Sequence, residues 1–210
     1  MSAASVADAE RRALADVSLE LGPDQPTLCG EWDVRMLLAH LIVRERRPDA
    51  ALGIFLPPLA SWTERVQTRT AHGDFGELVA TVRGGPPPWS PMTLPPLRTV
   101  DVQEYFIHHE DVRRAQSDWS PRPPEPERDN ILWSQLALLG RLSYRKSPVG
   151  VTLRRPDGAE HVVRSGPRPV VLTAEPGELV LHAAGRSQAV VSPEGEPADV
   201  AAVQALDRGL

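Results

Sequence analysis

One stretch, VQEYFIHHEDVRR at residues 102–114, decides the fold and the site expected of this chain. It reads as helix, and because Glu104 and His108 lie four residues apart, both side chains should leave one face of that helix. A carboxylate and an imidazole at this spacing can bind one divalent cation together. His109 points about 100° away around the helix. It could replace His108 as a ligand only if Glu104 were dropped as well.

A second helical segment supplies the third expected ligand. His40 lies in the sequence MLLAHL, residues 36–41, and two helices carrying His40, Glu104 and His108 would hold one metal between them. A histidine among leucines is more often a hydrogen-bonded core residue than a ligand, and that alternative stays open for His40. Asp111 continues the face of His108. We expect it to accept a hydrogen bond from a ligating imidazole and so fix the tautomer of that ring.

The surrounding residues follow a helical pattern up to about residue 147. Apolar residues recur three or four positions apart, Asp33 is a good N-cap for the helix of His40, and Gly22 with the following proline ends the first helix. Further helices are expected at 59–70, 75–83, 99–115 and from 126 onward, with proline-rich loops before the last two. Four main helices in antiparallel order predict a four-helix bundle.

The apolar spacing changes to two near residue 148. Residues 149–153 and 161–163 read as a hairpin around a Pro-Asp-Gly turn. Beyond it we expect a strand at 169–173, a helix at 177–184, a strand at 188–192 and a helix at 197–206. The chain is therefore predicted to be mainly α, with a helical domain at residues 1–147 and a small α+β domain at 148–210.

Composition limits the functions that this chain can have. Its 210 residues are 41% hydrophobic and 24% charged, and its formal net charge of -5 argues against a general nucleic-acid binder. The first residues do not form a secretory leader, and no apolar run reaches the roughly twenty residues of a membrane span. We therefore expect a globular, cytoplasmic protein with neither nucleic-acid nor membrane partners.

For Cys29 and for the arginines at the helix ends we expect no chemical role. Cys29, the only cysteine, cannot form an internal disulfide, and we expect it to be structural rather than nucleophilic because no base adjoins it in the sequence. Arginines near the ends of the two ligand-bearing helices are expected to be solvated. They are Arg44, Arg46, Arg47, Arg113 and Arg114.

Three sequence stretches carry a resemblance to a known family. They are GEWDVRMLLAHL at 30–41, EYFIHHEDVRRA at 104–115 and PGELVLHAAGR at 176–186. They resemble the mycothiol-dependent maleylpyruvate isomerase family of DinB/YfiT-like metal-binding bundles, and more narrowly an actinobacterial metal-binding subfamily of unassigned reaction. The resemblance implies a DinB-like four-helix bundle followed by a sterol-carrier-protein-2-like (SCP2-like) lobe. It implies the same three metal ligands, His40, Glu104 and His108.

The predicted function is divalent-metal binding. Two imidazoles and one carboxylate suit zinc, and they also accept nickel, iron or manganese. The resemblance implies a mycothiol-dependent transferase or isomerase, in which the metal activates a small thiol toward an electrophilic substrate. Two alternatives remain open: a metal-dependent hydrolase, and a non-catalytic metal-binding or small-ligand carrier whose metal braces the bundle. No catalytic residue beyond the metal ligands is assigned.

Overall fold

The computed structural model describes residues 2–54 and 56–208. The chain divides into two compact units, Met1–Trp119 and Ser120–Leu210. It is mainly helical and contains a small four-stranded mixed sheet, so the expected mainly α class is confirmed. Within the described ranges, no helix is both long enough and apolar enough to cross a membrane.

The division between the units falls after Trp119, whereas the sequence pattern places it between residues 147 and 148. The difference concerns one helix, α7 (Pro126–Ser143), which packs against helix α8 (Pro176–Ala183) and strand β2 (Glu160–Arg164). Helical periodicity shows that α7 has an apolar face, but it does not show what covers that face. In the structure α7 is grouped with the C-terminal unit.

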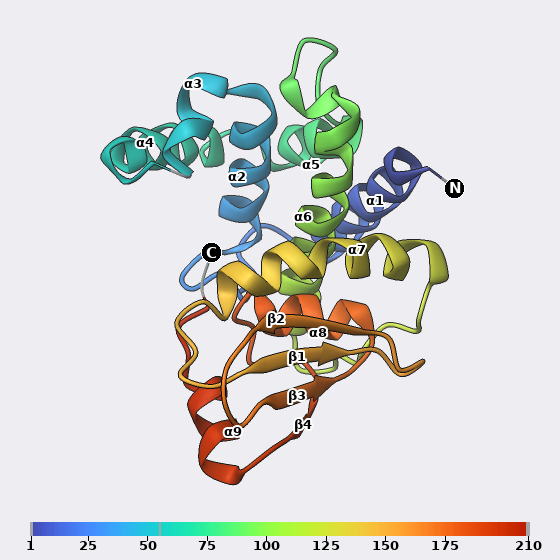
Figure 1. Ribbon diagram of the computed structural model, residues 1–210. Coiled ribbons are helices and arrows are strands. Elements are labelled where there is room, and N and C mark those ends of the chain that lie inside the picture. Colours follow the sequence, from blue (N-terminus) through green and yellow to red (C-terminus); the bar gives the residue numbers. More distant parts are fainter. Residues whose placement is uncertain (1, 55, 209–210) are drawn as a thin grey trace. The chain divides into compact units, whose positions relative to one another are not determined.

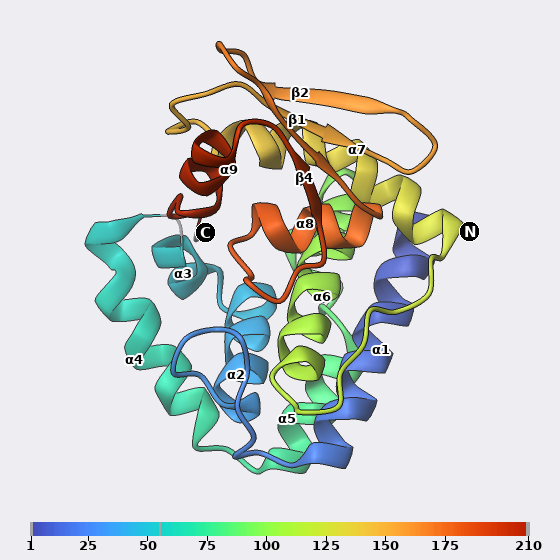
Figure 2. The same cartoon turned by 90° about the horizontal axis from the view of Figure 1, so that it is seen from below.

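Helices build the N-terminal unit. They are α1 (Ala3–Leu21), α2 (Val34–Arg46), α3 (Pro48–Ala51), η1 (Leu52–Ile54), η2 (Pro57–Leu59), α4 (Ala60–Ala71), α5 (Phe75–Gly84), η3 (Pro91–Thr93) and α6 (Pro95–Arg114). Helix α1 packs against α5 and α6, and α2 packs against α4 and α5. In both Figure 1 and Figure 2, α2 and α6 run side by side.

Local sequence signals set the ends of these helices. The Asp33 carboxylate caps α2 by accepting a 2.7 Å hydrogen bond from the backbone N–H of Met36. Gly22 ends α1 with a φ of 91°, a conformation that favours glycine. Helix α6 begins at Pro95, earlier than the expected start near Thr99. Prolines fit the first turn of a helix, because the N–H that they lack would have no partner there.

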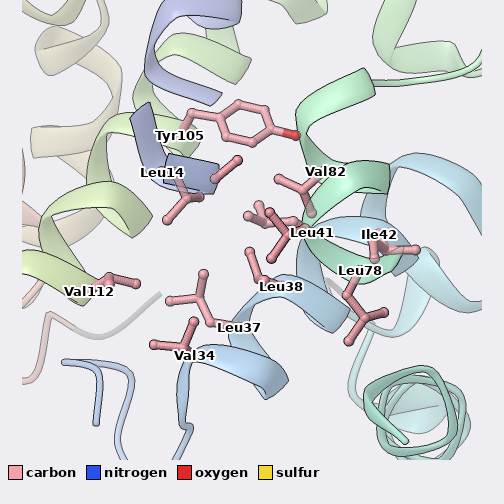
Figure 3. Packing of buried hydrophobic residues seen from close by; sticks show 12 residues of the cluster. Leu14, Val34, Leu37, Leu38, Leu41, Ile42, Leu78, Val82, Tyr105 and Val112 are labelled. Atoms are coloured by element: carbon pink, nitrogen blue, oxygen red, sulfur yellow. The ribbon is translucent and has the colours of Figure 1, made fainter. Parts of the chain in front are cut away.

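The core of the N-terminal unit lies among α1, α2, α5 and α6. Figure 3 shows their apolar side chains meeting in one cluster. The buried members are Leu14, Ala15, Val34, Leu37, Leu38, Leu41, Ile42, Leu78, Val79, Val82, Tyr105 and Val112. Each buried leucine contributes about 1.5–3 kcal/mol. This packing holds α2 and α6, the two helices that carry the expected metal ligands, at a fixed separation.

The C-terminal unit combines helices with the sheet. Its remaining elements are β1 (Val151–Arg154), β3 (Val170–Thr173), β4 (Ser192–Glu194) and α9 (Pro197–Gln204). The strand order is β2-β1-β3-β4, with β1 antiparallel to β2 and parallel to β3, and with β3 antiparallel to β4. The hairpin, the third strand and the two short helices agree with the sequence pattern. The last strand begins later than expected, because the N–H of Val190 donates to Glu178 of α8.

A buried histidine connects the end of α7 to α8. The Tyr144 hydroxyl lies 2.6 Å from Nδ1 of His182 and donates to it when the neutral ring carries its proton on Nε2. Arg208 donates to the backbone carbonyl of His182 at 2.9 Å. Burial, and after it the charge of Arg208, lowers the pKa of His182 to about 4. The folded unit therefore keeps this ring neutral at pH values where an unfolded histidine takes up a proton.

We expect the free energy of unfolding of the C-terminal unit to fall as the pH drops from about 6.5 toward 4. In this pH range the unfolded chain binds a proton at His182 that the folded unit excludes. The free energy of unfolding should therefore fall by roughly 3 kcal/mol between pH 6.5 and pH 4. Urea unfolding at several pH values measures this loss. The variant His182→Asn keeps an acceptor near the position of Nδ1 and should show a shallower pH dependence; an unchanged slope would contradict the assignment.

Gly140 should be required where α7 meets the sheet. A Cβ at this position would lie 2.6 Å from Cγ1 of Val163 and 3.2 Å from Cδ1 of Leu153, and the β-branched Val163 cannot easily move aside. We expect Gly140→Ala to lower the free energy of unfolding by about 1–3 kcal/mol in urea titrations. The matched control is Gly84→Ala in α5, where a Cβ meets nothing within 4 Å. Equal stability of the two variants would rule out this packing.

Candidate metal centre

Two helices of the N-terminal unit bring the three predicted ligands together. His40 lies on α2, whereas Glu104 and His108 lie one turn apart on α6, and one donor atom from each residue lies within 4.8 Å of the other two. Oε1 of Glu104 is 3.4 Å from Nε2 of His40 and 3.4 Å from Nε2 of His108. The structure therefore brings the three expected residues together between α2 and α6.

The donor atoms have the spacing that a small divalent cation requires. Zinc binds imidazole nitrogen at about 2.0–2.1 Å and carboxylate oxygen at about 2.0–2.2 Å, so neighbouring ligand atoms in a tetrahedron lie about 3.4 Å apart. Both distances from Glu104 to the histidines have this value. Two imidazoles and a carboxylate are also donor types that zinc prefers. The three residues therefore offer donor atoms of the type and spacing that a zinc ion takes.

The ligand side chains are shielded from water. His40 and His108 are 7% and 8% exposed, and the Glu104 side chain is 25% exposed. The two imidazole rings meet edge to face, with centroids 5.3 Å apart. Trp32 packs against His40 with a centroid separation of 5.1 Å. Electrostatic interactions among the buried groups are stronger here than they would be in water.

Asp111 orients the ring of His108. Its side chain is fully buried, and Oδ2 lies 3.0 Å from Nδ1 of His108. A carboxylate in contact with Nδ1 keeps the proton on that nitrogen, so Nε2 is the nitrogen that faces Glu104 and can bind a cation. The structure thus places Asp111 within hydrogen-bond distance of His108, one helical turn away.

Arg44 is buried beside the ligands, so the expectation that it is a solvated helix end was wrong. Its side chain is 8% exposed, Nη1 lies 2.7 Å from Oδ1 of Asp101, and Nε lies 3.5 Å from Oε1 of Glu104. The sequence contains the signal for this placement. Arg44 follows His40 by one helical turn and therefore leaves the same face of α2.

Two other arginines also differ from the solvated interpretation. Arg46 donates to the backbone carbonyl of Gly85 at 2.8 Å. Arg114 is buried and forms an ion pair with the buried carboxylate of Glu110. Arg47 remains substantially exposed, as expected. Charge alone therefore does not identify the solvated end of a helix, because Arg44, Arg46 and Arg114 each find an acceptor within the protein.

Burial and neighbouring groups shift the pKa values of Glu104 and His108. Burial raises the pKa of Glu104, but the charge of Arg44 and the hydrogen bonds with the two histidines hold it well below its usual value. Burial lowers the pKa of His108, but hydrogen bonds with Asp111, Cys29 and Glu104 raise it well above its usual value. Glu104 is therefore anionic at neutral pH. A cation that binds must displace a proton from His108.

Cys29 lies next to the ligand-bearing face of α6. Its Sγ is 3.0 Å from Oδ2 of Asp111 and 3.6 Å from Nδ1 of His108. The thiol thus has an imidazole beside it in space, although no base adjoins it in the sequence. No periodic spacing connects residue 29 with residue 108, so only the tertiary structure reveals this neighbour.

His109 lies outside the ligand group. Its Nδ1 is 3.1 Å from Oε2 of Glu10 on α1, and both residues are buried. One residue along the helix turns the side chain by about 100°, which is enough to point it toward α1 instead of α2. The structure therefore separates the adjacent histidines as the helical geometry predicts.

Comparisons with protein-family models, curated proteins and solved structures find no match to this chain. Family membership is consequently not shown by similarity. The case for a metal centre depends on the distances, burial and donor types of His40, Glu104 and His108.

We expect His40→Ala and His108→Ala to remove most of the bound metal from protein purified without a histidine tag. Each change deletes an imidazole donor from a set of three, and elemental analysis of each variant measures the loss. His109→Ala is the matched control and should keep the metal, since its ring contacts Glu10. Equal losses in all three variants would mean that the faces of α6 are assigned incorrectly.

Proposed function

We propose that this chain binds one divalent metal ion through His40, Glu104 and His108. The observation that carries the proposal is the position of Glu104 Oε1, 3.4 Å from an Nε2 atom on each side. Zinc suits this donor set best, and nickel, iron or manganese can occupy the same ligands. We propose further that the N-terminal unit is a DinB/YfiT-like bundle and that the C-terminal unit is SCP2-like, as the resemblance carried by the stretches at 30–41, 104–115 and 176–186 suggests.

We infer that the protein is a thiol-dependent transferase or isomerase, with mycothiol as the thiol and a small electrophile as the substrate. A cation in this site supplies Lewis acidity that lowers the pKa of a bound thiol or water. The three ligands contribute a single negative charge, from Glu104, so a dication and its ligands keep a net positive charge that favours a thiolate. The support for mycothiol in particular is the sequence resemblance.

The residues around the ligands prepare the site before a cation or substrate arrives. Asp111 holds the proton of His108 on Nδ1 and so keeps Nε2 directed toward Glu104. Arg44 lies against the Glu104 carboxylate at 3.5 Å and is itself held by Asp101 at 2.7 Å. Ligands fixed in this way need little rearrangement on binding, which favours a site built for chemistry on rigid helices.

Calorimetric titration with mycothiol tests the catalytic part of the proposal. We expect the thiol to bind the metal-loaded wild type and not the metal-free protein or His40→Ala, because the thiolate needs the cation. Turnover of a panel of activated alkenes and epoxides should then depend on both metal and thiol. Stoichiometric metal without thiol binding, together with unfolding of the bundle on chelation, would instead favour a metal that braces α2 against α6.

A further inference from the structure

The loop between α1 and α2 brings a thiol to the edge of His108 that faces away from Glu104. His108 directs Nε2 toward Glu104, whereas Nδ1 faces Asp111 at 3.0 Å and Cys29 at 3.6 Å. Sγ of Cys29 is also 3.0 Å from Oδ2 of Asp111. Thiol, carboxylate and imidazole donors therefore form a second group of metal-ligand types whose atoms all lie within 4.8 Å of one another.

Backbone hydrogen bonds fix the position of this thiol. The N–H of Leu28 donates to the backbone carbonyl of Asp111 at 3.1 Å, which ties the loop directly to α6. The Thr27 hydroxyl accepts from the N–H of Cys29 at 3.1 Å and donates to the carbonyl of Trp32 at 2.7 Å. Cys29 is thus held beside Asp111 by the same loop that places Trp32 against the ring of His40.

The spacing of the second group is compatible with a bound cation. Zinc binds thiolate sulfur at about 2.3 Å and imidazole nitrogen at about 2.0–2.1 Å, so these two atoms lie about 3.6 Å apart in a tetrahedral site. The distance from Cys29 Sγ to His108 Nδ1 has this value. The two 3.0 Å contacts of Asp111 are hydrogen bonds in the metal-free protein. They need to lengthen by about 0.4 Å (to the nitrogen) and about 0.6 Å (to the sulfur) for its carboxylate to become a ligand.

We propose that Cys29, Asp111 and Nδ1 of His108 form a second cation position for a thiophilic divalent ion such as zinc or cadmium. The thiol proton of Cys29 and the Nδ1 proton of His108 leave to solvent when this position fills. His108 is then shared between two cations through its two ring nitrogens. This position goes beyond the first metal centre and does not depend on a thiol substrate.

Charge balance supports two ions in this buried region. Glu104 and Asp111 contribute a negative charge each, and the deprotonated Cys29 and the doubly deprotonated ring of His108 contribute one each. These four negative charges together equal the positive charge of two dications, which compensates the cost of burying charge in a site where Asp111 is fully enclosed. Sulfur favours the softer divalent ions and distinguishes this position from the nitrogen–oxygen site on the other side of the ring.

Titration with cobalt(II) tests the second position, because a cobalt-bound thiolate gives a sulfur-to-metal charge-transfer absorption in the near ultraviolet. We expect the wild type to bind about two cobalt ions, matching the two donor groups, and to show this absorption. Cys29→Ser should bind about one and lack the absorption. His40→Ala disrupts only the first centre, so it should keep the absorption while its total uptake falls. Circular dichroism of each variant checks that it is folded.

The outcomes separate this proposal from the proposed function. If neither the wild type nor folded His40→Ala shows thiolate absorption, the second position does not exist, while uptake that depends on His40 would leave the first centre intact. If the absorption appears and His40→Ala takes up as much cobalt as the wild type, the second position stands and the first centre is overturned.

Discussion

The compensation of buried charge between α2 and α6 is the constraint on which the candidate site depends. Asp101 and Glu104 both point toward Arg44, and a buried carboxylate without a partner costs several kcal/mol. Burial raises the pKa of Asp101 despite Arg44, whereas the charge of Arg44 and the histidine contacts lower that of Glu104. Glu104, the carboxylate that faces His40 and His108, is therefore the acid whose ionised form these neighbours favour most.

Helical spacing makes part of this site predictable from the sequence. Glu104, His108 and Asp111 lie on one face of a single helix, so their proximity follows from the residue numbers alone. The pairing of that face with His40 requires two helices to be neighbours, and the leucines around His40 supply the apolar stripe that makes packing of its helix expected. Arg44 was predictable by the same spacing, but its charge favoured a solvated interpretation.

Other features depend on contacts between elements that periodicity does not describe. Cys29 reaches Asp111 through a loop whose position is set by backbone hydrogen bonds, and those bonds have no signature in residue type. Helix α7 has the same apolar period whether its partner is a bundle or a sheet. The one sequence feature that fits packing on β2 is Gly140, whose missing side chain lets Val163 of β2 lie close to the backbone of α7. For this reason the sequence pattern places the boundary after α7, whereas the contacts in the structure place it before α7.

The packing of α7 on the sheet also bears on how such a chain can evolve. A duplication or fusion that moved only the segment after residue 147 would leave behind the helix that covers β2 and α8. The transferred sheet would expose apolar surface and would be prone to pair with other chains. The segment that begins at Ser120 is therefore the unit that keeps its own core, and recombination within the proline-rich link before α7 would leave both units whole.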